Sequence, residues 1–318
     1  MPSPTFDVVA VGEVNADLIL SGDVVPAFGQ TEKLVEDARL VIGSSTAIFA
    51  CGAARLGLRT ALIGKVGDDI LGRFMVDALN ERGVDTSGII VDPHVATGLS
   101  VILSTGLDRA ILTAPGGIPA LRYSEIDLSI IHSARHLHLG GYFLLDNLRP
   151  DIPHLFKKAR QSGLTTSLDT NFDPAGKWDA GLEDLLAQVD VFMPNETEAK
   201  AIAKVDDVEA AIGLIAKTAR VVAVKMGSRG AVAQRRDMEQ VSLDAPSIGV
   251  VDTVGAGDSF DAGFLFGFLT DQSLISCLRL GIACGSLSTG QPGGTEGQPE
   301  IQKALQFIHY HWPKGEVR

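Results

Sequence analysis

The fold of this chain is decided by one glycine-rich stretch, Asp252-Thr253-Val254-Gly255-Ala256-Gly257-Asp258. An apolar run, residues 248–251, comes before it, and apolar residues with helical spacing follow it over 260–268. This pattern predicts a strand, a tight turn and then a helix. Glycine lets the backbone approach a ligand closely, and the free N–H groups of a helix start favour an anion. We therefore expect a phosphate-binding turn here.

Asp258 closes this stretch and places a carboxylate beside the predicted phosphate site. A phosphoryl-transfer enzyme needs such a group to accept the proton of the acceptor hydroxyl. We expect Asp258 to be the general base, with the N–H groups of Gly255, Ala256 and Gly257 stabilising the transferred phosphoryl group. A simple helix cap is the alternative for an aspartate at this position.

Apolar strand-like runs alternate with helical patterns along almost the whole chain. Such alternation indicates a mostly parallel sheet covered by helices on both faces. Polar or glycine residues follow several of these runs, and ligands of open α/β sheets bind outside the carboxyl ends of the strands. We therefore expect one cleft at that edge. The strands are predicted at residues 8–11, 60–63, 136–139, 165–168, 189–193 and 221–225.

Two segments, 31–42 and 98–114, break this rhythm because they resemble strands without intervening helices. The second resembles a hairpin that turns near Thr105 to Asp108. The simplest interpretation is a small β flap inserted into the α/β body. An antiparallel extension of the main sheet is the alternative.

The composition excludes several classes of protein. With 318 residues, of which 45% are hydrophobic, the chain can bury a large core, and its net charge of −12 argues against nucleic acid or anionic membrane as partners. No apolar stretch reaches the length of a membrane span, and the N-terminus lacks the features of a secretory signal. The three cysteines suggest reduced thiols. We expect a cytoplasmic protein.

The stretch 252–258 and its continuation, Ser259-Phe260-Asp261-Ala262-Gly263-Phe264-Leu265, closely resemble the C-terminal signature of the ribokinase-like, or PfkB, family of carbohydrate kinases. The resemblance spans nearly the full chain, because further motifs of the family follow one another in order. They are GEVNAD at 12–17, GSSTAIFACGAARLG at 43–57, GKVGDD at 64–69, PNETEA at 194–199 and KMGSRG at 225–230.

This resemblance implies a ribokinase-like three-layer α/β sandwich, in which helices cover both faces of a mostly parallel sheet. Residues 1–318 would form a single catalytic domain, and about 15–42 and 98–114 would form a small β-sheet lid. In the family such a lid closes over the sugar and often contributes to dimer contacts.

On the nucleotide side, the resemblance implies ATP and Mg²⁺ as cofactors. Glu198 of the Asn195-x-x-Glu198 motif would order Mg²⁺ through water. Without the resemblance, the simplest interpretation of Asn195 is a helix cap, and that of Glu198 is a favourable interaction with the helix dipole. The glycines after residue 225 would then mark a β-turn. The residues expected to bind ATP are Asn195, Lys225, Gly227 and Gly230.

On the sugar side, Ile48 stands where the family usually carries an asparagine that holds the sugar. Asp173 replaces a common arginine in Asp169-Thr170-Asn171-Phe172-Asp173, which makes a neutral sugar the favoured acceptor over an acidic or phosphorylated one. Calcium does not suit this loop, since its later positions lack the required glycine and glutamate. The residues expected to contact the sugar are Asn15, Asp17, Gly43, Ser44, Arg109, Tyr142 and Asn171.

Asp252 has two interpretations. It would hold the glycine turn, or it would help to bind a monovalent cation such as K⁺, as often happens in the family. The family pattern Thr-Arg-Pro-Gly is replaced here by Gly290-Gln291-Pro292-Gly293, which counts against the cation.

Together these patterns predict a kinase that transfers the γ-phosphoryl group of ATP to a hydroxyl of a small neutral sugar. Its partners would be the sugar and ATP, with a homodimer through the lid and neither nucleic acid nor membrane. A nucleoside kinase of the same fold is one alternative, and a non-catalytic sugar or nucleotide sensor is another. An intact Asp258 beside Gly255 and Gly257 counts against the sensor.

Overall fold

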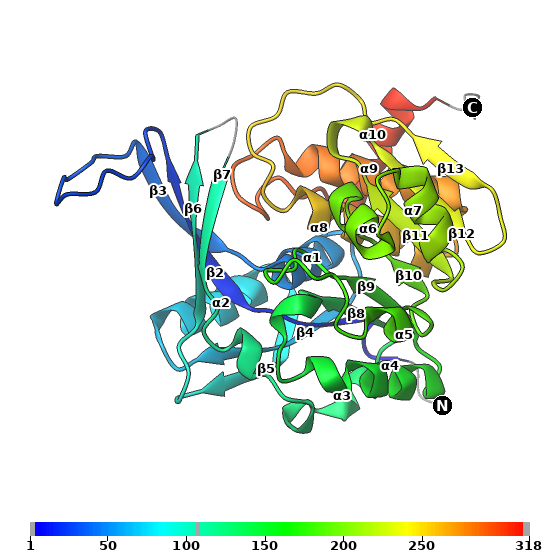
Figure 1. Ribbon diagram of the computed structural model, residues 1–318, viewed down its shortest axis with the longest axis horizontal. Helices are drawn as coiled ribbons and strands as arrows, with labels where there is room; N and C mark the ends of the chain where they lie inside the picture. Colours follow the sequence, from blue (N-terminus) through cyan, green and yellow to red (C-terminus); the bar gives the residue numbers. More distant parts are fainter. Residues whose placement is uncertain (1–3, 106–108, 314–318) are drawn as a thin grey trace.

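The computed structural model describes residues 4–105 and 109–313 and contains two separate sheets (Figure 1). The larger has nine strands in the order β13-β12-β11-β10-β9-β8-β1-β4-β5. The strands are β1 (Val8–Val11), β4 (Thr60–Gly67), β5 (Val84–Asp92), β8 (His136–Gly140), β9 (Thr165–Asp169), β10 (Val191–Phe192), β11 (Val221–Lys225), β12 (Ala231–Arg235) and β13 (Gln240–Leu243).

Every strand pair from β5 to β11 is parallel, and only β12 and β13 run antiparallel to their neighbours. Alternate residues of β1 enter different cores: Val8 and Ala10 belong to one cluster, Val9 and Val11 to the other. A strand buried on both faces is a continuous apolar run, which explains why these strands were visible in the sequence. The predicted mostly parallel sheet is confirmed.

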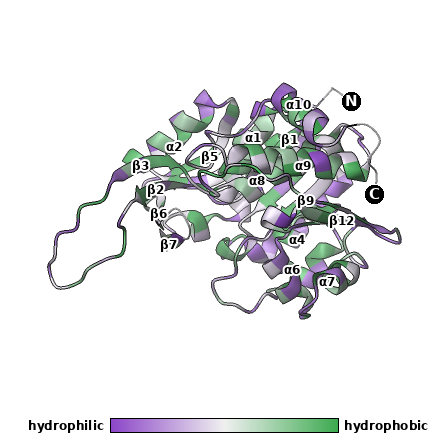
Figure 2. Cartoon of the chain, turned by 90° about the horizontal axis from the view of Figure 1, so that it is seen from above, coloured by the Kyte–Doolittle hydropathy of each residue, from purple (hydrophilic) through white to green (hydrophobic). Residues whose placement is uncertain are grey.

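Helices cover both faces of this sheet. Figure 2 shows α1, α8, α9 and α10 on one side, and α4, α6 and α7 on the other. No helix within the described ranges is long and apolar enough to cross a membrane. The helices are α1 (Ser45–Arg55), α2 (Ile70–Glu81), α3 (Leu128–His132), α4 (Ile152–Gln161), α5 (Leu182–Leu186), α6 (Glu196–Ala203), α7 (Val208–Ile215), α8 (Ala256–Leu269), α9 (Leu274–Ser288) and α10 (Ile301–His311).

The smaller sheet has the order β3-β2-β6-β7 and stands beside the α/β body (Figure 1). Its strands are β2 (Asn15–Ser21), β3 (Asp37–Ile42), β6 (Gly98–Ser104) and β7 (Arg109–Ala114). Strands β3, β6 and β7 come from the two segments predicted to form a flap, 31–42 and 98–114, whereas β2 precedes them and lies within the range 15–42 that the resemblance implied. None of the four extends the main sheet. Most of the turn predicted near Thr105 to Asp108 lies outside the described residues. We call these four strands the small sheet.

The predicted strand at 248–251 is wrong. The main sheet ends at β13, and the chain then reaches α8 without a further strand in the described segment. Val250 and Val251 are 57% and 58% exposed, and the N–H of Val251 donates to the carbonyl of Thr289 at 2.8 Å. An apolar run predicts a strand only where a neighbouring strand offers a ladder of partners, and here a single hydrogen bond is made.

Candidate active site

The chemically interesting residues gather at the carboxyl edge of the main sheet. Asp169 ends β9, Lys225 ends β11, and α8 begins at Ala256 beside them. Strand β1 lies between β4 and β8, so the order of the sheet reverses at this strand. Open α/β sheets bind their ligands at such a switch point. The convergence expected from the sequence is therefore present.

The glycine turn is as tight as the sequence suggested. Gly255 is the N-cap of α8 and has φ 70°, and a Cβ at this position would lie 2.7 Å from the Cα of Gly294. Both the left-handed backbone and the close approach require glycine. Ile48 is 3% exposed and packs against Gly255 and Gly294. Ile48 therefore packs against the glycine turn, and its apolar side chain offers none of the hydrogen bonds that an asparagine would make.

Asp252 ties the turn to the loop after α9. Its Oδ1 accepts the N–H of Val254 at 3.0 Å, and its Oδ2 accepts the N–H of Gly293 at 2.9 Å. These two hydrogen bonds agree with the interpretation in which Asp252 holds the glycine turn. Binding of a monovalent cation by Asp252 stays a prediction.

Asp258 lies in the first turn of α8, within a group of buried and half-buried carboxylates. Oxygens of Asp169, Asp258 and Asp261 all lie within 4.8 Å of one another. Burial, and then the charge of Asp169, raises the pKa of Asp258 to about 7, while the charge of Lys225 opposes this rise. A carboxylate with such a pKa is suited to accept a proton near neutral pH.

Asn195 and Glu198 form a capping box at the start of α6. The Glu198 carboxylate accepts the N–H of Asn195 at 2.9 Å, and the Asn195 side chain accepts the N–H of Glu198 at 2.9 Å. Burial, and then the charge of Asp169, raises the pKa of Glu198 to about 7. Gly227 and Gly230 form the turn after β11, both with positive φ. Their roles toward ATP and Mg²⁺ stay predictions.

Asn15, Asp17 and Gly43 form one contact group where the small sheet meets the body. The Asn15 amide donates to Oδ1 of Asp17 at 2.9 Å. A Cβ on Gly43 would lie 2.0 Å from the same oxygen, so glycine is required for the carboxylate to sit there. Burial, and then the charge of Glu13, raises the pKa of Asp17 to about 7.

Glu13 and Ser45 were missed among the candidate residues. Ser44 caps α1 by accepting the N–H of Ala47 at 3.1 Å, and its hydroxyl donates to the carbonyl of Glu13. The buried Glu13 carboxylate accepts the N–H of Ser45 at 2.9 Å, and the Asn171 amide donates to the Ser45 hydroxyl. The position of Glu13 in the sequence could have identified it, because Glu13 follows the carboxyl end of β1, the strand at the switch point.

The structure places Arg109 and Tyr142, both expected at the sugar, in different surroundings. Arg109 reaches from β7 of the small sheet to the glycine turn, where it donates to the Thr253 hydroxyl at 3.2 Å. Tyr142 is 1% exposed, and its hydroxyl donates to the carbonyl of Ala180 at 2.7 Å. Tyr142 is thus a core residue whose hydroxyl has a partner within the protein, and its contact with the sugar stays a prediction.

Asp173 closes its own loop. Its carboxylate accepts the N–H groups of Ala175, Lys177 and Trp178 at 2.9, 2.7 and 2.7 Å. Burial opposes ionisation, but these hydrogen bonds outweigh it and lower the pKa of Asp173. Asp173 therefore stabilises its own loop, and it contributes no positive charge where the family often has an arginine.

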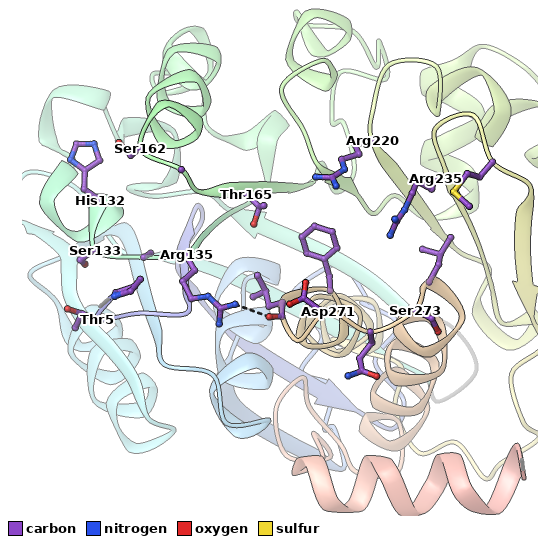
Figure 3. A pocket seen from close by; sticks show the side chains of 18 of the residues that line it. Thr5, His132, Ser133, Arg135, Ser162, Thr165, Arg220, Arg235, Asp271 and Ser273 are labelled. Carbon is purple, nitrogen blue, oxygen red and sulfur yellow. Dashed lines mark hydrogen bonds between the residues drawn. The ribbon is translucent and has the colours of Figure 1, made fainter. Parts of the chain in front are cut away.

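A large cavity of about 1590 Å³ lies at the opposite edge of the main sheet (Figure 3). It is lined by Thr165 at the start of β9, by Arg220 before β11, and by Arg135, which donates to the carbonyl of Leu269 at 3.0 Å. None of the predicted site residues lines it. Because the amino ends of parallel strands rarely form the catalytic cleft, its size does not make it the active site.

The chain is similar to named sugar kinases. It is 33% identical to an uncharacterized sugar kinase of Archaeoglobus fulgidus, over 78% of this chain and 98% of that protein. It is 32% identical to an ATP-dependent ribose-1-phosphate kinase of Halopiger xanaduensis, over 95% of this chain and 97% of that protein.

Solved structures show the same fold. A putative ribokinase II from E. coli superimposes with a TM-score of 0.84 at 25% identity, covering 96% of this chain and 100% of that one. The same protein in complex with ATP and Mg²⁺ gives a TM-score of 0.83 at 24% identity. The family model of the pfkB carbohydrate kinases matches residues 5–301. This chain therefore belongs to the pfkB family of carbohydrate kinases, phosphotransferases with an alcohol group as acceptor.

Proposed function

We propose that this chain transfers the γ-phosphoryl group of ATP to a hydroxyl of a small neutral sugar, with Asp258 as the general base. One observation carries the proposal. Asp258 lies in the first turn of α8, directly after the tight turn at Gly255, and its pKa is raised to about 7. The Asp258 carboxyl group and the backbone of the glycine turn thus lie within one helical turn of each other.

The chemistry follows from these positions. Asp258 would take the proton of the acceptor hydroxyl as that oxygen attacks. The N–H groups of Gly255, Ala256 and Gly257 would stabilise the charge that spreads over the phosphoryl oxygens. These donors stand at the start of a 14-residue helix, whose dipole favours the same negative charge.

Bound Mg²⁺ would neutralise phosphate charge. Carboxylate and amide oxygens are ligands that suit Mg²⁺, directly or through water. The residues at the nucleotide end fit this requirement, since the Asn195 and Glu198 side chains lie together at the start of α6, after the carboxyl end of β10. Glu198 would hold the ion through water, and the turn at Gly227 and Gly230 would lie along the nucleotide.

The acceptor side favours a neutral sugar. Carboxyl and amide groups of Glu13, Asp17 and Asn171 meet there, and these groups recognise hydroxyls. A carboxylate or phosphate on the acceptor would meet negative charge, because Asp173 replaces an arginine. Arg109 is the cation that the small sheet brings toward the glycine turn.

We also propose that the small sheet acts as a lid and joins two copies of the chain. Several of its large apolar side chains are exposed, among them Leu40 at 41%, Ile111 at 52% and Leu112 at 62%. Pairing of two such surfaces would remove this area from water. A cytoplasmic location is proposed with it, supported by three buried, free cysteines.

The test is ADP release with ATP, Mg²⁺ and a panel of pentoses, hexoses, acidic sugars and nucleosides. Turnover of a neutral sugar by the wild-type chain, abolished in Asp258→Asn while ATP still binds, would support the assignment. Turnover of nucleosides alone would replace it with a nucleoside kinase. Binding without turnover across the panel would favour a sensor.

A further inference from the structure

Lys225 occupies the centre of the carboxylate group at the start of α8. Its side chain is 12% exposed, and its Nζ lies 2.7 Å from Asp169 Oδ2 and 3.0 Å from Asp261 Oδ2. A Cβ on Gly257 would lie 3.7 Å from this nitrogen. The ammonium group is therefore placed directly against the first turn of α8.

The ammonium group contacts two carboxyl groups, one on β9 and one on α8. A lysine ammonium has three N–H groups. Three carboxylate oxygens, one of Asp169 and two of Asp261, lie at 2.7, 3.1 and 3.0 Å. The group is thus held in place from β9 and from α8, and its hydrogen bonds go to these two carboxyl groups.

We propose that Lys225 is a positioning residue for phosphoryl transfer, which acts through Asp258 rather than on ATP. Its fixed positive charge favours the ionised form of Asp258 and holds the first turn of α8 against β9. This inference rests on the proposed function of Asp258, and it replaces the expected contact between Lys225 and the nucleotide.

The charges around Asp258 make this cation necessary. Three negative groups act on Asp258, namely Asp169 on β9, Glu198 on α6 and Glu13 after β1, and one positive group does so, Lys225 on β11. Asp261 follows one turn along α8, and His138 on β8 interacts with Asp169 and Lys225. Burial raises the pKa of Asp258, the charges of Asp169, Glu13 and Glu198 add to that rise, and Lys225 lowers it. Without Lys225 the pKa of Asp258 would rise further, and a smaller fraction of the base would be ionised at neutral pH.

The ammonium itself stays charged. Burial alone would lower the pKa of Lys225, but the charges of Asp169, Asp261 and Glu198 outweigh burial and raise it. The charge of Lys225 also lowers the pKa of Asp169, although burial opposes this, while the pKa of Asp261 is raised by burial. Lys225 and Asp169 therefore form the ion pair, and Asp261 holds the pair from the other side.

The decisive variant is Lys225→Met, which keeps the length of the side chain and removes its charge. We expect kcat at pH 7 to fall by about tenfold or more, with KM for ATP changed by less than about threefold. The acid limb of the pH profile should move up by roughly one pH unit or more. At pH 9 much of the lost rate should return.

Lys65→Met is the matched control. Lys65 is 3% exposed at its side chain, lies on β4 of the same sheet and is also held by two carboxylates, Asp92 at 3.2 Å and Glu125 at 2.5 Å. It contacts none of the groups around Asp258 in these interactions. We expect Lys65→Met to lose stability as Lys225→Met does, and to leave the acid limb in place.

A charge-balanced variant, Lys225→Met with Asp169→Asn, keeps the proposal testable if the single variant folds poorly. It removes one positive and one negative charge, so its acid limb should return toward that of the wild type. An unmoved acid limb in Lys225→Met, or a large rise in KM for ATP with that limb in place, would overturn the role of Lys225. A wild-type chain without turnover on the whole panel would instead overturn the proposed function.

Discussion

Arg109 on β7 donates a hydrogen bond from Nη1 to the Thr253 hydroxyl, 3.2 Å away, and so connects the small sheet to the glycine turn. Ile19 and Ile102 of the same sheet form a small apolar cluster with Val254, the next residue of that turn. The two contacts place the small sheet over the start of α8. A sheet that reaches the phosphate turn in this way can shield the reacting groups from water.

Replacing Arg109 with alanine should weaken closure without harming the fold. Arg109 is exposed, and loss of its charged hydrogen bond to Thr253 is worth roughly 1 kcal/mol, or about fivefold. We expect kcat/KM for the sugar to fall by about that factor while the melting temperature is unchanged. Arg39→Ala, on β3 of the same sheet and paired with Asp37, is the control. Equal effects of both variants would mean that charge on the sheet matters and the Thr253 contact does not.

The two glycines of the turn should respond differently to alanine. Gly255 has φ 70° and a backbone neighbour 2.7 Å from the site of a Cβ, so Gly255→Ala should cost at least about 1–3 kcal/mol of stability together with activity. Gly257 has room, with Lys225 at 3.7 Å, so Gly257→Ala should keep the melting temperature. Its methyl group would intrude on the phosphoryl group, and the rate should fall roughly tenfold or more. Thermal melts and ADP release on both variants check this contrast.

Much of this arrangement could be predicted from the sequence, and particular residues show why. Lys225 ends a run of buried valine and alanine, and such a run on a central parallel strand fixes both the strand and its carboxyl end. The glycine turn was equally visible, since Gly255 needs a backbone that other residues avoid. Signals of this kind are local, so one stretch of sequence contains them.

The features that the sequence did not predict depend on contacts between segments that are far apart in the chain. The ion pair between Lys225 and Asp169 joins residues 56 positions apart, and no spacing rule reveals it. Tyr142 was expected at the sugar, but the carbonyl that satisfies its hydroxyl belongs to Ala180, in a loop with no pattern of its own. The strand expected at 248–251 failed for the same reason, because a partner strand is a property of the fold.

Ile48→Asn tests whether the family's sugar-binding asparagine has a place here. Ile48 packs against Gly255 and Gly294, so an amide would be buried without partners and would lose apolar contact, which should cost about 3 kcal/mol. We expect a lower melting temperature and lower activity. Ile48→Val, at about 1 kcal/mol, is the matched control. A gain in affinity for sugar in Ile48→Asn would show instead that this side chain reaches the acceptor.

Asp258→Asn should separate catalysis from stability across pH. The general base must be ionised, so wild-type kcat/KM should rise about tenfold per pH unit up to about pH 7 and then level, and Asp258→Asn should lose several orders of magnitude. The free energy of unfolding of the wild type should instead fall as pH rises. The pKa of Asp258 is raised to about 7 in the fold, so the protonated carboxyl stabilises the chain fully below about pH 4, and this contribution is lost as pH rises through 7.

Asparagine cannot ionise, so Asp258→Asn should match the wild type near pH 4 and exceed its stability by ~2 kcal/mol at pH 8, after allowance for the partial exposure of the site. Urea unfolding at the two pH values measures this difference. Asp146→Asn, an aspartate whose side chain is 62% exposed, should show no such divergence. A wild type that is more stable than Asp258→Asn at pH 8 would mean that the carboxylate is held by favourable contacts in the resting fold. Asp258 would then have a structural role in the first turn of α8, and the catalytic assignment would lose its base.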